Sequence, residues 1–113
     1  MASILQRFIP TIILHVPWLH VNGMALFPFI LVKHAQPSAT LINHERIHLT
    51  QQLEMLVLPF YIWYLTEYAW HKLRYKDGYY AYRKICFEQE AFTHDQNLAY
   101  LQHRSFGAWF KFL

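Results

Sequence analysis

Charged residues are scarce in this chain of 113 residues. Asp, Glu, Lys and Arg together make up 15% of it, against roughly 25% of a typical soluble domain. Aromatic residues, in contrast, reach 19%. High hydrophobicity and low net charge exclude a long disordered chain, because disorder requires the opposite balance. Too few charges remain to cover the surface of so small a protein.

Cysteine is scarcer still. Cys86 is the only one, so an internal disulfide is excluded, and with it the class of disulfide-stapled miniproteins. A single cysteine is compatible with a protein that resides in a reducing compartment.

Positive charge is present but does not indicate a nucleic-acid binder. The net charge is +3, and the cations are too few and the aromatic residues too mixed with aliphatic ones for that class. Half of the cations follow directly after a long apolar stretch, which favours an anionic membrane surface as partner: Lys72, Arg74, Lys76, Arg83 and Lys84.

The chain, residues 1–113, has the length of one domain, and its first part, residues 1–37, is an apolar segment. No charged residue occurs from Phe8 to Val32, a stretch long enough to span a bilayer. Proline breaks the hydrogen-bond ladder of a helix, and this stretch is interrupted by Pro10, Pro17, Gly23 and Pro28. We therefore expect a short apolar element followed by one or two strands, the better one near Phe27 to Lys33.

The next part, residues 38–74, begins with a helix. Ser38 or Thr40 can cap it by accepting a hydrogen bond from a free N–H of the first turn. We expect the helix to run over residues 39–58, and Pro59 should kink or end it.

An uncharged, aromatic-rich run follows at residues 55–66. On length alone it is a buried or interfacial helix. If the helix continues to Trp70, it becomes long enough to cross a membrane, with Tyr and Trp placed as in an aromatic belt. We therefore expect the protein to be membrane-associated or integral to a membrane.

A further helix is expected over residues 79–103, after a turn at Asp77-Gly78. A break at Arg104-Ser105-Phe106-Gly107 separates it from a short aromatic tail, residues 104–113. These elements predict a single domain that is mainly α with a small N-terminal β element.

Inside the first of these helices, His44-Glu45-Arg46-Ile47-His48 matches the pattern H-E-x-x-H. Residues four apart lie about 40° apart around a helix, so both imidazoles lean to one side and can share one Zn²⁺. Glu45 lies beside such a metal, where a carboxylate can take a proton from activated water and deliver it to a leaving amine. The helix is apolar on nearly every side, and buried polar groups need partners. We therefore predict a metal site here rather than ordinary core histidines.

A catalytic zinc needs a third protein ligand and an open position for water. Cys86 is one candidate, and the helix that follows adds Glu88 and Glu90, which point about 200° apart, so at most one faces the core. Glu88 shares its face with more apolar residues and is the expected ligand. Glu90 is then solvated, or paired with Arg83 or His94.

These motifs resemble the gluzincin branch of zinc metallopeptidases, in particular its small membrane-associated members. The H-E-x-x-H pattern is followed forty residues later by Glu88 in an E-x-E-A helix, and the resemblance covers residues 40–95. It implies zincin-like helices with a complete site: His44 and His48 as zinc ligands, Glu88 as third ligand, and Glu45 as general base and acid. Several membrane gluzincins carry E-x-x-x-D. Here Phe92 occupies the Asp position, so that carboxylate is missing unless Asp95 replaces it.

Other residues are candidates for positions around the metal. Asp95 can orient an imidazole by accepting its free N–H, or it is a polar residue at a helix edge. Gln51, on the metal-facing side of its helix, can bind substrate or be a buried amide held by the backbone. An extended peptide could pair with the strand near residues 27–33. The donor that stabilises the oxyanion is left open among Tyr79, Tyr80, Tyr82 and His94.

Together these patterns predict a zinc-dependent hydrolase, and among hydrolases a peptidase, with a peptide or protein substrate. The alternative is a non-catalytic small membrane protein with a structural metal site or an interaction role. It is motivated by length, because 113 residues leave little wall for a substrate cleft. Neither the substrate nor the oligomeric state follows from the sequence.

Overall fold

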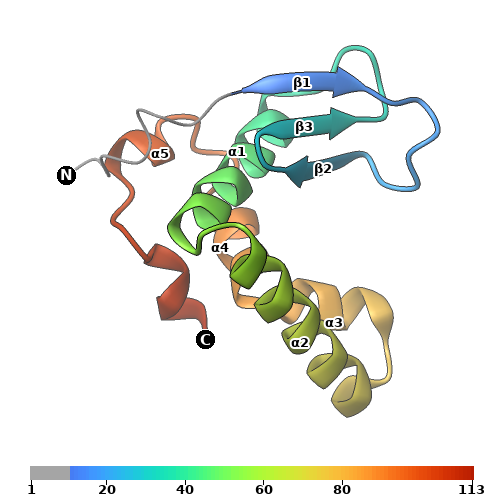
Figure 1. Ribbon diagram of the computed structural model, residues 1–113, viewed down its shortest axis with the longest axis vertical. Helices are drawn as coiled ribbons and strands as arrows, with labels where there is room; N and C mark the ends of the chain where they lie inside the picture. The colour runs from blue at the N-terminus through green and yellow to red at the C-terminus, as the bar shows by residue number, and fades with distance from the viewer. Residues whose placement is uncertain (1–10) are drawn as a thin grey trace.

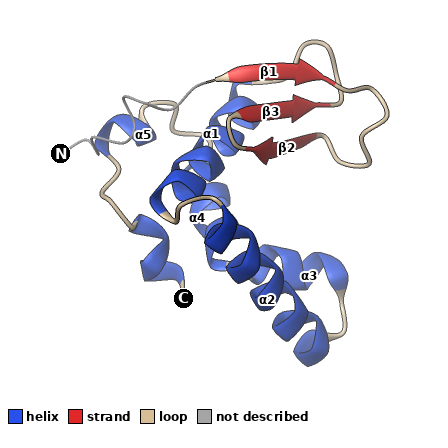
Figure 2. Ribbon diagram, in the orientation of Figure 1, coloured by secondary structure: helices blue, strands red, loops and turns tan. Residues whose placement is uncertain are grey.

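The chain folds into a small sheet and a series of helices that begin beneath the sheet and extend away from it (Figure 1). The computed structural model describes residues 11–113. The start of the apolar N-terminal segment, up to Pro10, lies outside these residues. The fold is mainly helical with an N-terminal β element, as the sequence predicts, and Figure 2 shows the two kinds of structure clearly separated.

Within residues 11–113 three strands form, rather than one or two: β1 (Ile12–His15), β2 (Gly23–Leu26) and β3 (Phe29–Val32). β3 is the central strand, parallel to β1 and antiparallel to β2. The strand expected near Phe27 to Lys33 is therefore paired on both sides and has no free edge. One face of the sheet is buried: Ala25, Ile30 and Val32 pack against Leu49 of the helix that follows, with the period of two that strands impose.

The first helix, α1 (Ala39–Glu54), begins where the sequence indicates. Ser38 Oγ accepts a hydrogen bond of 3.0 Å from Leu41 N, which satisfies one of the free N–H groups of the first turn. The helix ends at Glu54, before the expected residue, because the chain turns through Leu56, whose φ is +60°, and the residue after it.

Pro59 begins a helix rather than kinking one. It lies in the first turn of α2 (Leu58–Tyr75), where the N–H that proline lacks has no intrahelical partner to lose. α2 runs past Trp70 and projects from the body of the protein (Figure 1). Among the helices of residues 11–113, none is both long enough and apolar enough to cross a membrane. The membrane-crossing helix expected from the sequence is not among them.

The region expected to form one helix, residues 79–103, forms three, and a 3-10 helix follows in the tail: α3 (Gly78–Lys84), α4 (Cys86–His94), α5 (Tyr100–His103) and η2 (Ala108–Phe112). The chain bends at Ile85, whose backbone is extended (φ −60°, ψ 132°). Cys86 N donates a hydrogen bond of 3.1 Å to Glu67 Oε1 of α2, which satisfies a free N–H at the start of α4. The bend lets α3 pack along α2 while α4 packs against α1.

A buried ion cluster joins α1, α4 and the segment after α5. Arg104 makes hydrogen bonds of 2.6 and 2.9 Å to the two oxygens of Glu54 and also pairs with Glu90. Glu90 is fully buried. The expectation that it is solvated, or paired with Arg83 or His94, is therefore wrong.

Candidate metal centre

Three side chains from two helices converge where α1 and α4 pack together. Glu88 Oε1 of α4 lies 3.1 Å from His44 Nε2 and 3.0 Å from His48 Nε2, and the two Nε2 atoms are 3.2 Å apart. All three side chains are buried. The group is arranged so that it could hold a metal ion, which is what the sequence predicts for these residues.

Each histidine is held by a contact on its other ring nitrogen. His44 Nδ1 lies 3.0 Å from Asp95 Oδ2, and His48 Nδ1 lies 2.8 Å from Gln51 Oε1. Both partners are acceptors, so the neutral imidazoles carry their protons on Nδ1 and their lone pairs on Nε2. Both lone pairs therefore point toward Glu88. Metal-binding histidines in proteins are oriented in this way.

Gln51 is itself fixed in orientation. Its Nε2 donates hydrogen bonds of 3.1 Å to Phe87 O and 2.9 Å to Glu90 Oε1, so its side-chain oxygen faces His48. Gln51 is fully buried. Its buried amide therefore links a histidine of the site to the Arg104 ion cluster.

Asp95 is held in place against His44 by contacts of its own segment. Asn43 Nδ2 donates hydrogen bonds of 2.8 Å to Asp95 O and 3.0 Å to Asn97 O, which anchors the segment after α4 to α1. Phe92 instead packs edge-on against His44, with ring centroids 4.6 Å apart. The chain thus reaches His44 with a carboxylate from beyond the end of α4.

Glu88 also has an orienting partner, and it comes from α2. Tyr64 Oη donates a hydrogen bond of 2.7 Å to Glu88 Oε2, which leaves Oε1 to face the two histidines. The sequence analysis missed Tyr64, because nothing distinguishes it from the other aromatic residues of its run. The one signal that could have found it is its spacing: Tyr64 lies four residues after Phe60, which is buried, so its hydroxyl is on the same face of α2.

The donor set fits a small divalent cation. In a tetrahedral zinc site, metal–ligand distances near 2.0–2.2 Å place the ligand atoms roughly 3.3–3.6 Å apart. The three atoms here are 3.0–3.2 Å apart. Two neutral imidazoles and a carboxylate oxygen that face one point repel each other unless a proton or a metal cation lies between them. Among residues 11–113 the group offers three protein ligands, one fewer than the four of a closed tetrahedral zinc site.

The electrostatics of the group also favour a cation. Burial alone would lower the pKa of His48, but the Glu88 carboxylate raises that pKa to about 9. Burial alone would raise the pKa of Glu88, yet His48 and His44 hold it well below its ordinary value. In both cases the neighbouring groups outweigh desolvation. The carboxylate is therefore ionised and draws positive charge into the site.

Glu45 lies beside these three residues rather than among them. Burial raises its pKa, against the opposing effect of His48 and His44, and a carboxylate with a raised pKa is a stronger base near neutral pH. Gly23 of β2 approaches it closely. A Cβ on that glycine would lie 3.2 Å from Glu45 Oε2 and 2.9 Å from Leu41 Cδ1, so a larger residue would make the ends of these two side chains shift.

A groove of about 360 Å³ opens onto Glu45, His48 and Glu88. Much of its wall is apolar and comes from β2, the segment before it and α2, with Val21, Met24, Ala25, Leu26, Phe60 and Leu65. β2 is an edge strand, since the order in the sheet is β1-β3-β2. The strand edge beside the site therefore belongs to β2 and not to the strand that the sequence suggested.

Four other residues weighed in the sequence do not line this groove: Cys86, Tyr79, Tyr80 and His94. Cys86 Sγ donates to Glu67 Oε2 at 2.8 Å, and His94 stacks on Tyr100 with ring centroids 3.9 Å apart. The other two are exposed. Tyr82, in contrast, lines the groove. Burial and the Glu88 carboxylate raise its pKa far above the ordinary value, so its hydroxyl stays protonated.

Comparisons with known proteins assign no family to the chain. No family model matches it, and neither a curated protein nor a solved structure shows significant similarity. The interpretation of the site therefore rests on the geometry of this chain.

Proposed function

We propose that the protein is a zinc-dependent peptidase of the gluzincin type. The observation that carries the proposal is the oriented group of His44, His48 and Glu88. Two of its members, His48 and Glu88, line a groove that Glu45 also lines. Two imidazoles and one carboxylate suit zinc, and this ligand set with one open position recurs in catalytic zinc sites of metallopeptidases.

The chemistry assigns a separate task to each residue around the group. Bound zinc would lower the pKa of water and polarise the carbonyl of a peptide bond. Glu45 accepts a proton from the water as the water oxygen bonds to the carbonyl carbon of the peptide. It then gives that proton to the peptide nitrogen as the C–N bond breaks. Tyr82 donates a hydrogen bond to the developing oxyanion, since it lines the groove and stays protonated. One water is consumed for each bond cleaved.

β2 offers an extended peptide a backbone partner. Part of its outer edge is occupied, because Gln52 donates to Ala25 O at 2.8 Å and accepts from Phe27 N at 2.9 Å, as a neighbouring strand would. The stretch around Gly23 remains, and it lies beside Glu45. The apolar walls favour substrates with apolar side chains next to the bond that is cleaved.

The substitution Glu45→Gln tests the proposal, because it keeps the shape of the side chain and removes the base. We expect it to retain zinc and fold, and to slow hydrolysis of a quenched peptide library by about 10²–10⁴-fold. Asp77→Asn is the matched control: this exposed carboxylate caps α3 and does not line the groove, and Asn caps a helix equally well. Wild-type rates in zinc-loaded Glu45→Gln would refute the proposed role.

A structural metal is the second candidate, because all three ligands are buried. It predicts that the wild-type chain cleaves no peptide in the library, and that removal of zinc unfolds it. Zinc-dependent hydrolysis by the wild type, abolished in Glu45→Gln, excludes this candidate.

A further inference from the structure

The acidic residues of this protein are almost all withdrawn from its surface. All seven lie within residues 11–113, and only Asp77 is exposed. Glu45, Glu88, Glu90 and Asp95 are buried. Glu54 and Glu67 are half-buried as whole residues, although the side chain of Glu54 is only 1% exposed. Of the cations within residues 11–113, Arg104 is buried among these carboxylates, and the others are exposed or half-buried: Lys33, Arg46, Lys72, Arg74, Lys76, Arg83, Lys84 and Lys111. The surface is therefore far more positive than the net charge of +3 indicates.

The helix α2 carries apolar residues on its outward face as well as on the face that packs against the protein. Phe60 and Tyr64 face the protein, while one outward stripe of α2 is apolar and follows the helical period: Leu58, Ile62, Leu65, Ala69 and Leu73. Ile62 is 60% exposed and Leu73 is 77% exposed. No charged residue interrupts this stripe within α2, and no other part of residues 11–113 covers it.

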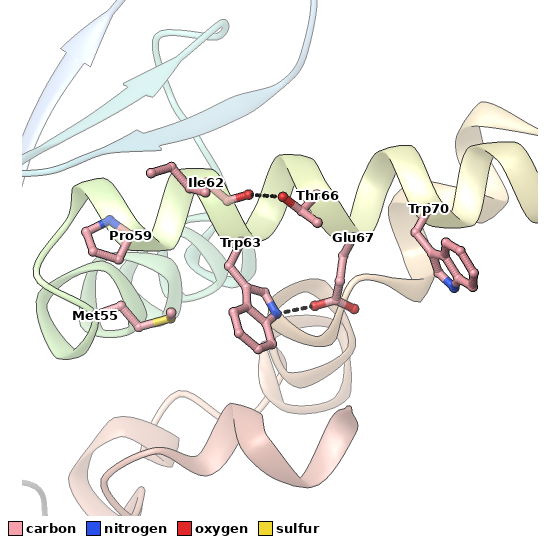
Figure 3. Close-up of a pocket in the computed structure, with 7 residues that line it drawn as sticks. All are labelled: Met55, Pro59, Ile62, Trp63, Thr66, Glu67 and Trp70. Carbon is pink, nitrogen blue, oxygen red and sulfur yellow. Dashed lines mark hydrogen bonds between the residues drawn. The ribbon is translucent and has the colours of Figure 1, made fainter.

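Tryptophans border the stripe on one side. In Figure 3, Trp63 and Trp70 project from the same side of α2, while Pro59 and Ile62 lie nearer its start. They line a hollow of about 520 Å³ with almost no polar surface, although Trp63 Nε1 donates a hydrogen bond of 2.8 Å to Glu67. Tryptophan has a large apolar ring with one polar N–H group, and such side chains are enriched at the boundary between lipid and water.

Positive charge borders the far end of the same helix. Lys72, Arg74 and Lys76 lie in and just after its last turn, and Arg83 and Lys84 lie on α3, which packs along α2. An apolar helix face flanked by cations matches an anionic lipid surface in both chemistry and charge. A second copy of the chain matches it poorly, because that copy offers the same cations and little exposed carboxylate to pair with them.

We propose that the outward face of α2 binds the surface of an anionic lipid bilayer. The stripe enters the boundary between headgroups and acyl chains, and the cations at the ends of α2 and α3 lie among the phosphates. This surface lies outside the candidate metal site except at Leu65, which also lines the groove. The inference uses only the apolar stripe and the cations, so it does not rest on the proposed function.

The test is flotation of the full chain with vesicles of phosphatidylcholine alone and of phosphatidylcholine with phosphatidylglycerol, at ~0.1 M and ~0.5 M salt. We expect binding to the anionic vesicles, weakened by salt. Ile62→Glu should lose at least about tenfold in binding. Leu98→Glu, at a similarly exposed apolar residue outside the stripe (59% against 60%), should bind like the wild type. Circular dichroism shows whether each variant is folded.

A second pair of variants tests the charge. Lys72→Gln with Arg74→Gln should lower binding to the anionic vesicles by roughly fivefold per cation, whereas Lys111→Gln should have no effect. The proposal is overturned if vesicle composition makes no difference, or if Ile62→Glu and Leu98→Glu behave alike. It is also overturned if the chain ignores vesicles and sediments as a dimer that Ile62→Glu dissociates, because the stripe then binds a second copy.

Discussion

Replacing Arg104 with Met would leave two carboxylates in the protein interior without their counter-ion. The side chains of Arg104, Glu54 and Glu90 are at most 1% exposed, so solvent cannot take the place of the guanidinium. Removing one partner of a buried ion pair costs about 3–5 kcal/mol. That is a large part of the roughly 5–15 kcal/mol by which a domain of this size is stable. With an unfolding entropy of about 2.1 cal/mol/K per residue, it corresponds to a fall in Tm of roughly 13–21 °C.

Thermal or urea unfolding followed by circular dichroism measures this loss. A charge-balanced variant, Arg104→Met with Glu54→Gln and Glu90→Gln, separates the uncompensated charge from lost packing. We expect it to regain most of the stability, because neutral amides need no counter-ion. A cost below about 1 kcal/mol for Arg104→Met, or equal loss in the two variants, would refute the view that this cluster is a paired, solvent-excluded ion network.

The substitution Arg104→Met should also weaken zinc binding at the candidate metal site. Arg104 holds Glu90, Glu90 accepts a hydrogen bond of 2.9 Å from Gln51, and Gln51 orients His48 at 2.8 Å. Zinc affinity measured by chelator competition should therefore fall in Arg104→Met at a temperature where the variant is still folded. Unchanged affinity would show that Gln51 keeps its orientation without this support.

Two further substitutions probe the surroundings of the site. Asp95→Ala removes the acceptor at His44 Nδ1 and should weaken zinc binding by about 10–100-fold, measured by chelator competition, while the fold remains; unchanged affinity would show that this contact does not orient the ring. Gly23→Ala introduces a Cβ 2.9 Å from Leu41 Cδ1 and 3.2 Å from Glu45 Oε2. It should lower the free energy of unfolding by roughly 1–3 kcal/mol through overpacking, and it should also slow peptide hydrolysis by the molecules that stay folded. A lowered Tm with wild-type hydrolysis by the folded variant would contradict the view that the close approach of Gly23 matters for Glu45.

The parts of the site that could be predicted from the sequence depend on local periodicity. His44 and His48 share a helix face because they are four residues apart, and Glu88 lies on the more apolar face of its own helix. The cap at Ser38 is also a local signal and is confirmed. Each of these follows from geometry within a single turn or a single helix.

The parts that could not be predicted depend on contacts between distant segments. The bend at Ile85 is accompanied by a hydrogen bond from Cys86 N to Glu67, which lies on another helix, and no pattern near residue 85 indicates it. Tyr64 reaches Glu88 only because α2 packs over the site. The edge beside the groove belongs to β2 because of the order of strands in the sheet, and that order is not encoded in any one strand.

The most direct test of the central claim is the metal content of the purified chain, measured by mass spectrometry after incubation with zinc and removal of excess ion. The account predicts about one zinc per chain. His48→Ala should lose it, while His71→Ala, at a histidine of α2 outside the site, should keep it. A wild-type chain that retains no zinc, or a His48→Ala variant that retains as much as the wild type, would contradict the claim that His44, His48 and Glu88 form a metal site.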